Sequence, residues 1–201
     1  MIDKPFSQAC ENNKRPILNI LAEHFAKTHH VLEIGSGTGQ HAVFFGQHLP
    51  HLTWQTSDLA INHAGINTWL NEHLIPTVKK PIELDLNNTW SLPRSNLHID
   101  GIFTANTLHI ISWPLVVKFF ESISKNINSP ARVCIYGPFK YEGEFTSESN
   151  ANFDLWLKSR DVNSGIRDIE AVLALSSSAK LSLINDYEMP ANNRLLVFKK
   201  D

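Results

Sequence analysis

The stretch VLEIGSGTGQHAVFF, residues 31–45, constrains the fold more than any other part of the sequence. It places three alternating glycines, Gly35, Gly37 and Gly39, between a short β-branched run and an apolar run with helical spacing. Because glycine has no Cβ, a strand followed by such a loop and a helix N-terminus brings backbone N–H groups close to a ligand. The segment therefore predicts a βα unit whose turn binds a small molecule.

The rest of the chain alternates between short β-branched runs and longer segments with helical periodicity, which is typical of a βαβ fold. The expected strands cover residues 31–34, 52–56, 81–84, 101–105 and 132–136. The expected helices cover residues 39–48, 60–74, 114–127 and 149–178, the last interrupted near Gly165. A further helix should begin near Pro16, since proline suits a first helical position and the apolar residues after it recur at helical spacing.

The C-terminal segment predicts two strands, 181–188 and 194–199, joined by a Pro-Ala-Asn-Asn turn. They would close an otherwise mostly parallel sheet with an antiparallel hairpin. At 201 residues, 42% of them hydrophobic, the chain can bury one good core and is short for two ordinary domains with a linker. We expect a single α/β domain over residues 1–201, with helices on both faces of the sheet.

Composition argues against several classes of protein. A formal net charge of −2 at pH 7 gives no positive field of the kind that gathers phosphate backbones, so nucleic acid is not an expected partner. No run of 18 apolar residues and no apolar signal segment is present, which favours a cytoplasmic protein without membrane contact. Cys10 and Cys134 are the only cysteines, and the ten histidines show no metal-ligand spacing, so neither a disulfide nor a metal is expected.

Three chemistries use a glycine loop after a strand. A phosphate-binding P-loop would end in Gly-Lys-Ser/Thr, whereas Gln40 and His41 follow Gly39 here. A dinucleotide fingerprint can be matched only weakly. Glu33, two residues before Gly35, separates the remaining candidates, because a carboxylate beside the loop repels a pyrophosphate but suits a ligand that carries an ammonium and a sulfonium.

The pattern Glu-x-Gly-x-Gly-x-Gly resembles motif I of the class I S-adenosylmethionine-dependent methyltransferases. Asp58, in WQTSDL, lies about 20 residues past the loop, where an acidic residue can accept hydrogen bonds from ribose hydroxyls. Asp85, in IELDL, matches the position at which many of these enzymes hold the adenine amino group. The resemblance implies a seven-stranded Rossmann-like sheet, S-adenosylmethionine as cofactor, and cofactor contacts by Glu33, Gly35, Ser36, Gly37, Thr38, Gly39, Asp58, Leu59, Asp85, Leu86 and Asn106.

Nearly the whole chain also resembles the methyltransferase-like 26 family, or domain of unknown function 938. The segments that carry this resemblance are FSQACENNKRPIL, the glycine loop, GIFTANTLHIISW and YGPFKYEGEFTSESNANFD. Each acidic residue has a structural alternative: Glu33 could order the loop through hydrogen bonds, and Asp58 and Asp85 could cap turns.

The candidate catalytic stretch is TANTLHIISW, at the end of the fourth expected strand, where ligand sites of open α/β sheets lie. Methyl transfer requires an aligned nucleophile and, for a hydroxyl or thiol, removal of a proton. His109 is the candidate base, although the same position can be structural, and Asn106 is expected to contact cofactor or substrate. The Asn/Asp-Pro-Pro-aromatic signature of amino-methylating nucleic acid enzymes is absent, because Thr107 and Leu108 follow Asn106.

Two segments could close the site. The polar stretch SQACENNK supplies Asn12 and Lys14, and the loop GPFKYEGEF follows Tyr136 and contains Tyr141. These four residues are candidate substrate contacts, although aromatic residues near a strand end are often core and charges at a helix start are often solvated.

The leading functional hypothesis is methyl transfer from S-adenosylmethionine to a small-molecule acceptor. A non-catalytic module that binds an adenosyl compound or a protein partner on the same fold is the alternative. A nicotinamide-dependent oxidoreductase ranks last, since Tyr136 and Lys140 lie on a strand and loop where one helical face cannot align them.

Overall fold

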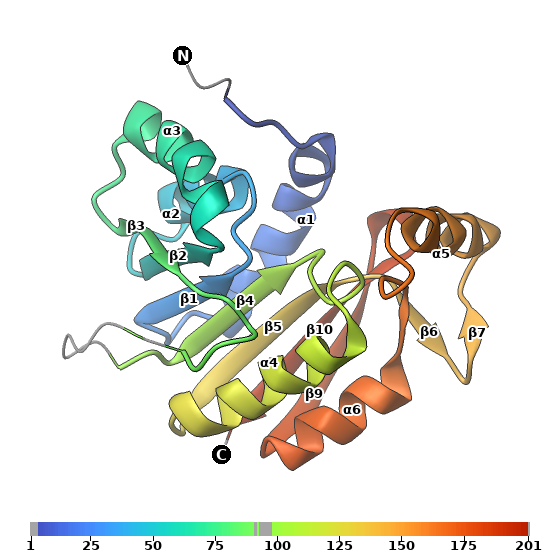
Figure 1. The fold of residues 1–201 in the computed structure, drawn as a ribbon. Helices are drawn as coiled ribbons and strands as arrows, with labels where there is room; N and C mark the ends of the chain where they lie inside the picture. The colour runs from blue at the N-terminus through green and yellow to red at the C-terminus, as the bar shows by residue number, and fades with distance from the viewer. Residues whose placement is uncertain (1–3, 91, 93–97, 201) are drawn as a thin grey trace. The chain divides into compact units, whose positions relative to one another are not determined.

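The computed structural model describes residues 4–90, 92 and 98–200. Its main sheet has seven strands, which in sheet order are β3 (Val78–Glu83), β2 (Thr53–Asp58), β1 (His30–Ile34), β4 (Gly101–Ala105), β5 (Ala131–Gly137), β10 (Asn193–Lys200) and β9 (Leu181–Met189). The pairs β1–β2, β1–β4 and β2–β3 are parallel, whereas β10 is antiparallel to both β5 and β9. The expected α/β fold with a mostly parallel sheet and a closing hairpin is confirmed (Figure 1).

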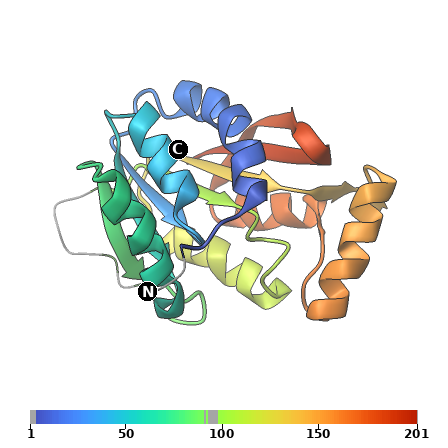
Figure 2. The same cartoon turned by 90° about the horizontal axis from the view of Figure 1, so that it is seen from above.

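The chain divides into two compact units, residues 1–104 and residues 105–201. Each is described by itself, and the single domain over residues 1–201 stays a prediction. Unit 1 contains α1 (Gln8–His24), α2 (Gln40–His48), the 3-10 turn η1 (Ala60–Asn62) and α3 (His63–His73). Helix α2 lies between α1 and α3 and contacts both (Figure 2). In the core, the rings of Phe45, Trp54 and Phe103 contact one another at centroid distances of 5.4 to 5.7 Å and join α2 to β2 and β4.

Unit 2 contains α4 (Trp113–Asn126), α5 (Glu148–Arg160) and α6 (Ile169–Ser178). Helices α4 and α6 run side by side, and α6 also contacts β9 (Figure 1). A second sheet has the order β7 (Glu144–Phe145), β6 (Phe139–Tyr141) and β8 (Arg167–Asp168). These three short strands are absent from the sequence prediction, and β8 divides the helical segment expected over 149–178.

The start of the first helix differs from its prediction. Helix α1 begins at Gln8, not near Pro16, because extended Ser7 caps it by accepting a hydrogen bond from the backbone N–H of Cys10 at 3.4 Å. Pro16 lies inside the helix, where it lacks the N–H for an i−4 bond. The helix tolerates this because it buries Ile17 and Leu21 completely. The capping serine therefore outweighs the preference of proline for a first turn.

A lysine from β10 caps the C-terminal end of α4. The Nζ of Lys200 donates hydrogen bonds to the carbonyl oxygens of Ile123 and Ser124 at 3.2 and 3.1 Å. These carbonyls belong to the last turn, where a positive charge complements the helix dipole; the Ile123 carbonyl also accepts the N–H of Ile127 at 3.0 Å. Burial lowers the pKa of Lys200, because the ammonium loses hydration.

We expect Lys200→Met to lower the free energy of unfolding by about 1–3 kcal/mol, because two carbonyls lose a charged donor. Urea denaturation measures the change. The matched control is Lys125→Met on α4, whose side chain is 75% exposed and lies 3.9 Å from Glu121, a surface pair worth less than about 1 kcal/mol. Equal losses in the two variants would contradict the capping role.

Candidate functional site

The conformation of the loop between β1 and α2 depends on its glycines. Gly35, Gly37 and Gly39 have φ angles of 74°, 57° and 88°, a left-handed conformation that disfavours other residues. The N–H groups of Gly35 and Ser36 both donate to the carbonyl of Ser57, which ties the loop to the end of β2. A Cβ on Gly39 would meet Ile66 at 3.2 Å, whereas a Cβ on Gly37 would meet nothing within 4 Å. The backbone at Gly37 is therefore open to a ligand.

Asp58, the last residue of β2, lies beside this opening. Its Oδ2 accepts a hydrogen bond from the N–H of Gly37 at 2.7 Å, and its Oδ1 accepts from the Leu59 N–H and the Asn62 side chain, both at 2.7 Å. A carboxylate has about four acceptor positions, so one remains on Oδ2. Asp58 thus orders the glycine loop through Gly37, accepts hydrogen bonds in the turn that follows β2, as its capping alternative predicts, and retains room for one hydroxyl donor.

Glu33 lies on β1 and is buried. Its Oε2 accepts hydrogen bonds from the Ser36 hydroxyl at 2.8 Å and from Trp54 Nε1 at 3.1 Å. Burial raises the pKa of Glu33 to about 7, although the bonds from Trp54 and Ser36 favour the carboxylate. The loop-ordering alternative is therefore supported for Glu33, and any effect on a ligand would be exerted by its charge.

The third acidic residue, Asp85, follows β3 and forms a turn. Its Oδ1 accepts hydrogen bonds from the backbone and side chain of Asn87 at 2.8 and 3.2 Å. Leu86 beside it is buried, whereas Leu59, which follows Asp58, is 47% exposed. A ligand contact by Asp85 stays a prediction, and its present bonds are those of a turn residue.

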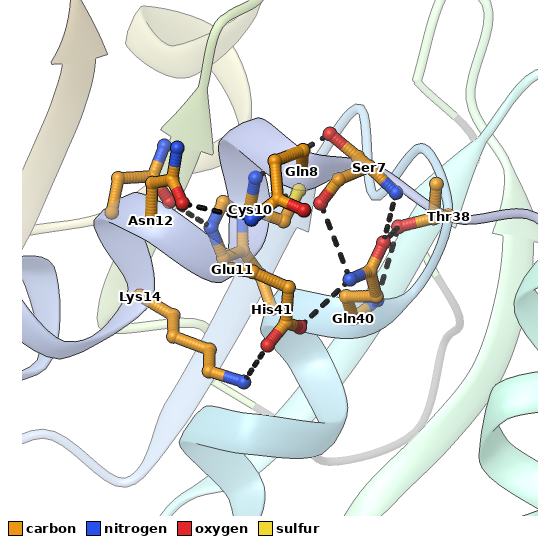
Figure 3. Close-up of polar contacts among 10 residues, drawn as sticks. Ser7, Gln8, Cys10, Glu11, Asn12, Lys14, Thr38, Gln40 and His41 are labelled. Atoms are coloured by element: carbon orange, nitrogen blue, oxygen red, sulfur yellow. Dashed lines mark hydrogen bonds and ion pairs between the residues drawn. The ribbon is translucent and has the colours of Figure 1, made fainter.

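The N-terminus of α1 is fastened to the end of the glycine loop by Gln40 (Figure 3). The buried Gln40 amide accepts hydrogen bonds from the Ser7 N–H at 2.6 Å and the Thr38 hydroxyl at 3.0 Å, and it donates to Glu11 Oε1 at 2.8 Å. The other oxygen of Glu11 pairs with Lys14, and this bond is the main cause that lowers the pKa of Glu11. The sequence interpretation used Gln40 only to exclude a P-loop and missed this role.

The predicted substrate residues of this segment differ in position. Lys14 is partly buried by its pairing with Glu11 and lies 4.9 Å from the centroid of the Phe44 ring. Asn12 is exposed and accepts a hydrogen bond from Gln8. A buried chain of contacts lies between α1 and α2: Cys10 Sγ is 3.9 Å from His41 Nδ1, and His41 Nε2 is 2.7 Å from Asn13 Oδ1. Burial lowers the pKa of His41 to about 4 and raises that of Cys10, so this chain is neutral.

In unit 2, Asn106 and His109 follow β4. Asn106 has a φ of 57°, and its N–H donates to the carbonyl of Tyr136 at 2.9 Å. His109 is 4% exposed, and its ring meets Phe153 edge-on at a centroid distance of 5.5 Å. A Cβ on Gly137 would lie 3.3 Å from His109 Nδ1, so glycine there makes space for the ring. Burial, and to a lesser extent the charge of Arg167, lowers the pKa of His109 to about 4.

Arg167, on β8, braces the segment that carries His109. Its guanidinium donates to the carbonyl of Leu108 at 2.9 Å, to that of Asn163 at 3.0 Å, and to that of Ile111. The N–H of Gly165 also donates to the carbonyl of His109. The sequence analysis did not identify Arg167, because its partners are backbone atoms up to 59 residues away, which no local pattern indicates.

The two tyrosines proposed as substrate contacts are held by the protein. Tyr136 is 3% exposed within β5. The Tyr141 hydroxyl donates to Asp186 Oδ2 at 2.7 Å, and Asp186 also pairs with Arg194 at 2.7 Å. Burial and the bond to Asp186 raise the pKa of Tyr141. Substrate contact by either residue stays a prediction.

Within residues 4–90, 92 and 98–200, no group of three or more His, Cys, Asp or Glu side chains could hold a metal ion. No helix in this part of the chain is long and apolar enough to cross a membrane.

Three solved structures illustrate the likeness of this fold to known proteins. An O-methyltransferase family protein from Burkholderia thailandensis has a TM-score of 0.81 and 15% identity over 94% of this chain and 56% of its own. An O-methyltransferase family 2 protein from Planctomyces limnophilus DSM 3776, in complex with apigenin, has a TM-score of 0.74 and 16% identity over 94% and 62%. PigF with SAH has a TM-score of 0.76 and 17% identity over 92% and 61%. The chain spans little more than half the length of these proteins, and the likeness shows the fold alone.

A comparison with protein families gives a match over almost the whole chain. Residues 4–200 match the family described as "Protein of unknown function (DUF938)". This agrees with the part of the sequence resemblance that concerned domain of unknown function 938. The chain belongs to the DUF938 family.

Proposed function

We propose that the protein is an S-adenosylmethionine-dependent methyltransferase that acts on a small-molecule acceptor. The observation that carries the proposal is the contact between Gly37 and Asp58, which places an open backbone beside a carboxylate with one remaining acceptor position. The fold is shared with proteins named as O-methyltransferases, and PigF is described with SAH. We also propose a relationship to methyltransferase-like 26 proteins and a cytoplasmic location.

The residues of unit 1 would divide the binding of the cofactor among them. Asp58 would accept one ribose hydroxyl on Oδ2, and the exposed backbone at Gly37 would allow close approach of the ligand. When bound, the cofactor supplies an activated methyl group on a sulfonium. Further proposed contacts of the cofactor in unit 1 are Ser36, Thr38, Leu59, Asp85 and Leu86. Asn106 of unit 2 is also a proposed contact.

A non-catalytic adenosyl-binding or interaction module remains the second candidate, and the environment of His109 favours it. The low pKa of about 4 makes this imidazole a weak base at neutral pH. An acceptor that is already nucleophilic needs no base, and the protein could still accelerate methyl transfer to it by aligning the acceptor with the cofactor. Incubation of the protein with labelled cofactor and a metabolite extract discriminates between the candidates, because only an enzyme transfers label.

The first test concerns the ribose contact. We expect Asp58→Asn to weaken binding of S-adenosylhomocysteine about 10- to 100-fold, that is by about 1–3 kcal/mol, because an acceptor for the ribose is lost or turned into a donor. Isothermal titration measures it. The control is Asp161→Asn, a turn aspartate of unit 2 that accepts hydrogen bonds from Asn163 and should leave binding unchanged. Tight binding of NAD with no binding of either adenosyl compound would overturn the proposed function.

The second test uses the buried carboxyl of Glu33. Because its pKa in the free protein is about 7, a sulfonium nearby should favour the carboxylate and lower that pKa. Affinity for S-adenosylmethionine should then rise several-fold between pH 5.5 and 7.5, as Glu33 ionises. Affinity for S-adenosylhomocysteine should change less over this range, because its sulfur carries no charge. Glu33→Gln should remove the difference between the two ligands. Parallel pH profiles for both ligands in the wild-type protein would show that the charge of Glu33 does not act on the sulfonium.

The third test concerns His109. We expect His109→Ala to lower the free energy of unfolding by about 2–4 kcal/mol at pH 7.5, since it empties a packed site. The pKa of His109 is depressed to about 4, so its contribution is present above pH 6.5 and is lost as the pH falls toward 4. The variant should therefore lose less stability over that range than the wild type in urea denaturation.

The control for this test is His98→Ala, an exposed histidine that should change stability by less than about 0.5 kcal/mol. A stable His109→Ala protein that binds cofactor normally but has lost turnover would support the base role instead.

A further inference from the structure

The four residues before α1 form more contacts than their number suggests. The indole Nε1 of Trp69 donates to the carbonyl of Pro5 at 2.7 Å, and Lys4 Nζ lies 3.6 Å from the centroid of the Trp69 ring. A Cβ on Gly65 would meet the Pro5 ring at 2.8 Å, so the glycine allows Pro5 to lie against α3. At the other end, Ser7 is held by Gln40 at 2.6 Å. We call residues 4–7 the N-terminal strap.

The two anchors of the strap place it at the edge of unit 1 that carries Asp58. Gln40 begins α2, directly after the glycine loop, and α3 follows β2 through η1. Strands β1 and β2 are parallel, so Gln40 and the first turn of α3, where Pro5 lies against Gly65, are toward their carboxyl ends. Trp69, and Glu72, which pairs with Lys4, lie further along α3. Figures 1 and 2 show residues 4–7 leading into the first turn of α1, and the Pro5 carbonyl is bonded to Trp69 of α3. The strap therefore runs from α3, the helix that follows Asp58, to Gln40 at the end of the glycine loop.

Phe6 occupies the middle of the strap and is 61% exposed, although both of its neighbours are fixed. Leu59 and Ile61, which directly follow Asp58, are 47% and 85% exposed. Among the described residues of unit 1, the other large apolar side chain with such exposure is Leu74, at the far end of α3. Leu59 and Ile61 thus place exposed apolar surface next along the chain to a carboxylate that can accept one more hydroxyl hydrogen bond. Phe6 directly precedes Ser7, which is bonded to Gln40 at the end of the glycine loop. Exposed apolar side chains on the two segments that adjoin the loop and the carboxylate are suited to a nucleoside.

We propose that the N-terminal strap forms the outer wall of the nucleoside site and that Phe6 contacts the bound nucleoside. Gln40 and Trp69 act as positioning residues, because they hold the strap at its two ends without reaching the ligand. This inference rests on the proposed function, since the nucleoside is taken to be the adenosyl part of the cofactor. It assigns a ligand contact to Phe6, which the sequence analysis used only as part of a family resemblance.

The test compares Phe6→Ala with Leu74→Ala, a matched loss of an exposed apolar side chain away from the site. Isothermal titration with adenosine and with S-adenosylhomocysteine should show a five- to twentyfold weaker affinity in Phe6→Ala for both ligands. Leu74→Ala should bind both like the wild type. Neither variant should change the melting temperature of the free protein, because both side chains lie in water.

Cys10 provides a second readout, since Cys134 is fully buried and Cys10 is partly accessible one turn after Ser7. Saturating S-adenosylhomocysteine should slow the reaction of Cys10 with a thiol reagent at pH 8.5 by at least about fivefold. The reaction slows because the bound ligand orders the strap and so limits access of the reagent to Cys10. Gln40→Leu, which releases one anchor, should reduce this protection and weaken binding of both ligands.

The outcomes separate the inference from the proposed function. No binding of any adenosyl compound by the wild-type protein overturns the proposed function. Binding by the wild type that is unchanged in Phe6→Ala overturns the inference and leaves the function standing. A loss confined to S-adenosylhomocysteine, with adenosine unaffected, or a lowered melting temperature of free Phe6→Ala, also overturns it, because the first places Phe6 away from the nucleoside and the second assigns it to folding.

Discussion

The hydrogen bond from the Gly37 N–H to Asp58 Oδ2 is the interaction on which the candidate site of unit 1 depends. It joins two loops whose strands are parallel neighbours, with Ile34 opposite Ser57 in the sheet. A charged acceptor makes this bond stronger than one between neutral groups. The left-handed glycines can then present the backbone outward while Ser57 O anchors the start of the loop. Loop geometry and the placement of the carboxylate are thus one feature, so the structural and ligand-binding interpretations of Asp58 are compatible.

Around this bond, burial disfavours the charged forms of ionisable groups, and charge gathers at the edge. The pKa of Glu33 is raised to about 7 and that of His41 is lowered to about 4, in both cases chiefly by loss of hydration. Glu11 has the opposite environment, since Lys14 and Gln40 stabilise its carboxylate and lower its pKa. A cationic ligand at this edge would therefore meet a partly ionised Glu33 and could favour its carboxylate without touching it.

The sequence predicted those features that depend on local pattern. The strand Gly101–Ala105 and the C-terminal hairpin follow from short β-branched runs and turn residues, and the spacing from the loop to Asp58 follows from the length of a βαβ unit. Features set by distant contacts were missed: Gln40 reaches back 33 residues to Ser7, and Arg167 reaches back 59 residues to Leu108. The direction of Tyr141 toward Asp186 is of the same kind, because a side chain at the end of a three-residue strand takes its orientation from partners that periodicity does not reveal.

Unit 2 shows why a residue at the expected place need not perform the expected chemistry. His109 follows β4, as a base would, yet its ring fills the space that Gly137 leaves and packs on Phe153. Arg167 donates to carbonyls on either side of it, so the backbone around a neutral imidazole is braced by one guanidinium. Methyl transfer from a sulfonium depends first on alignment, and a braced segment would help to align the reactants of the proposed reaction even where it supplies no base. A packed His109 would therefore be consistent with catalysis of acceptors that are already nucleophilic, which makes the protonation state of the acceptor, and not that of the histidine, the property that would govern the rate.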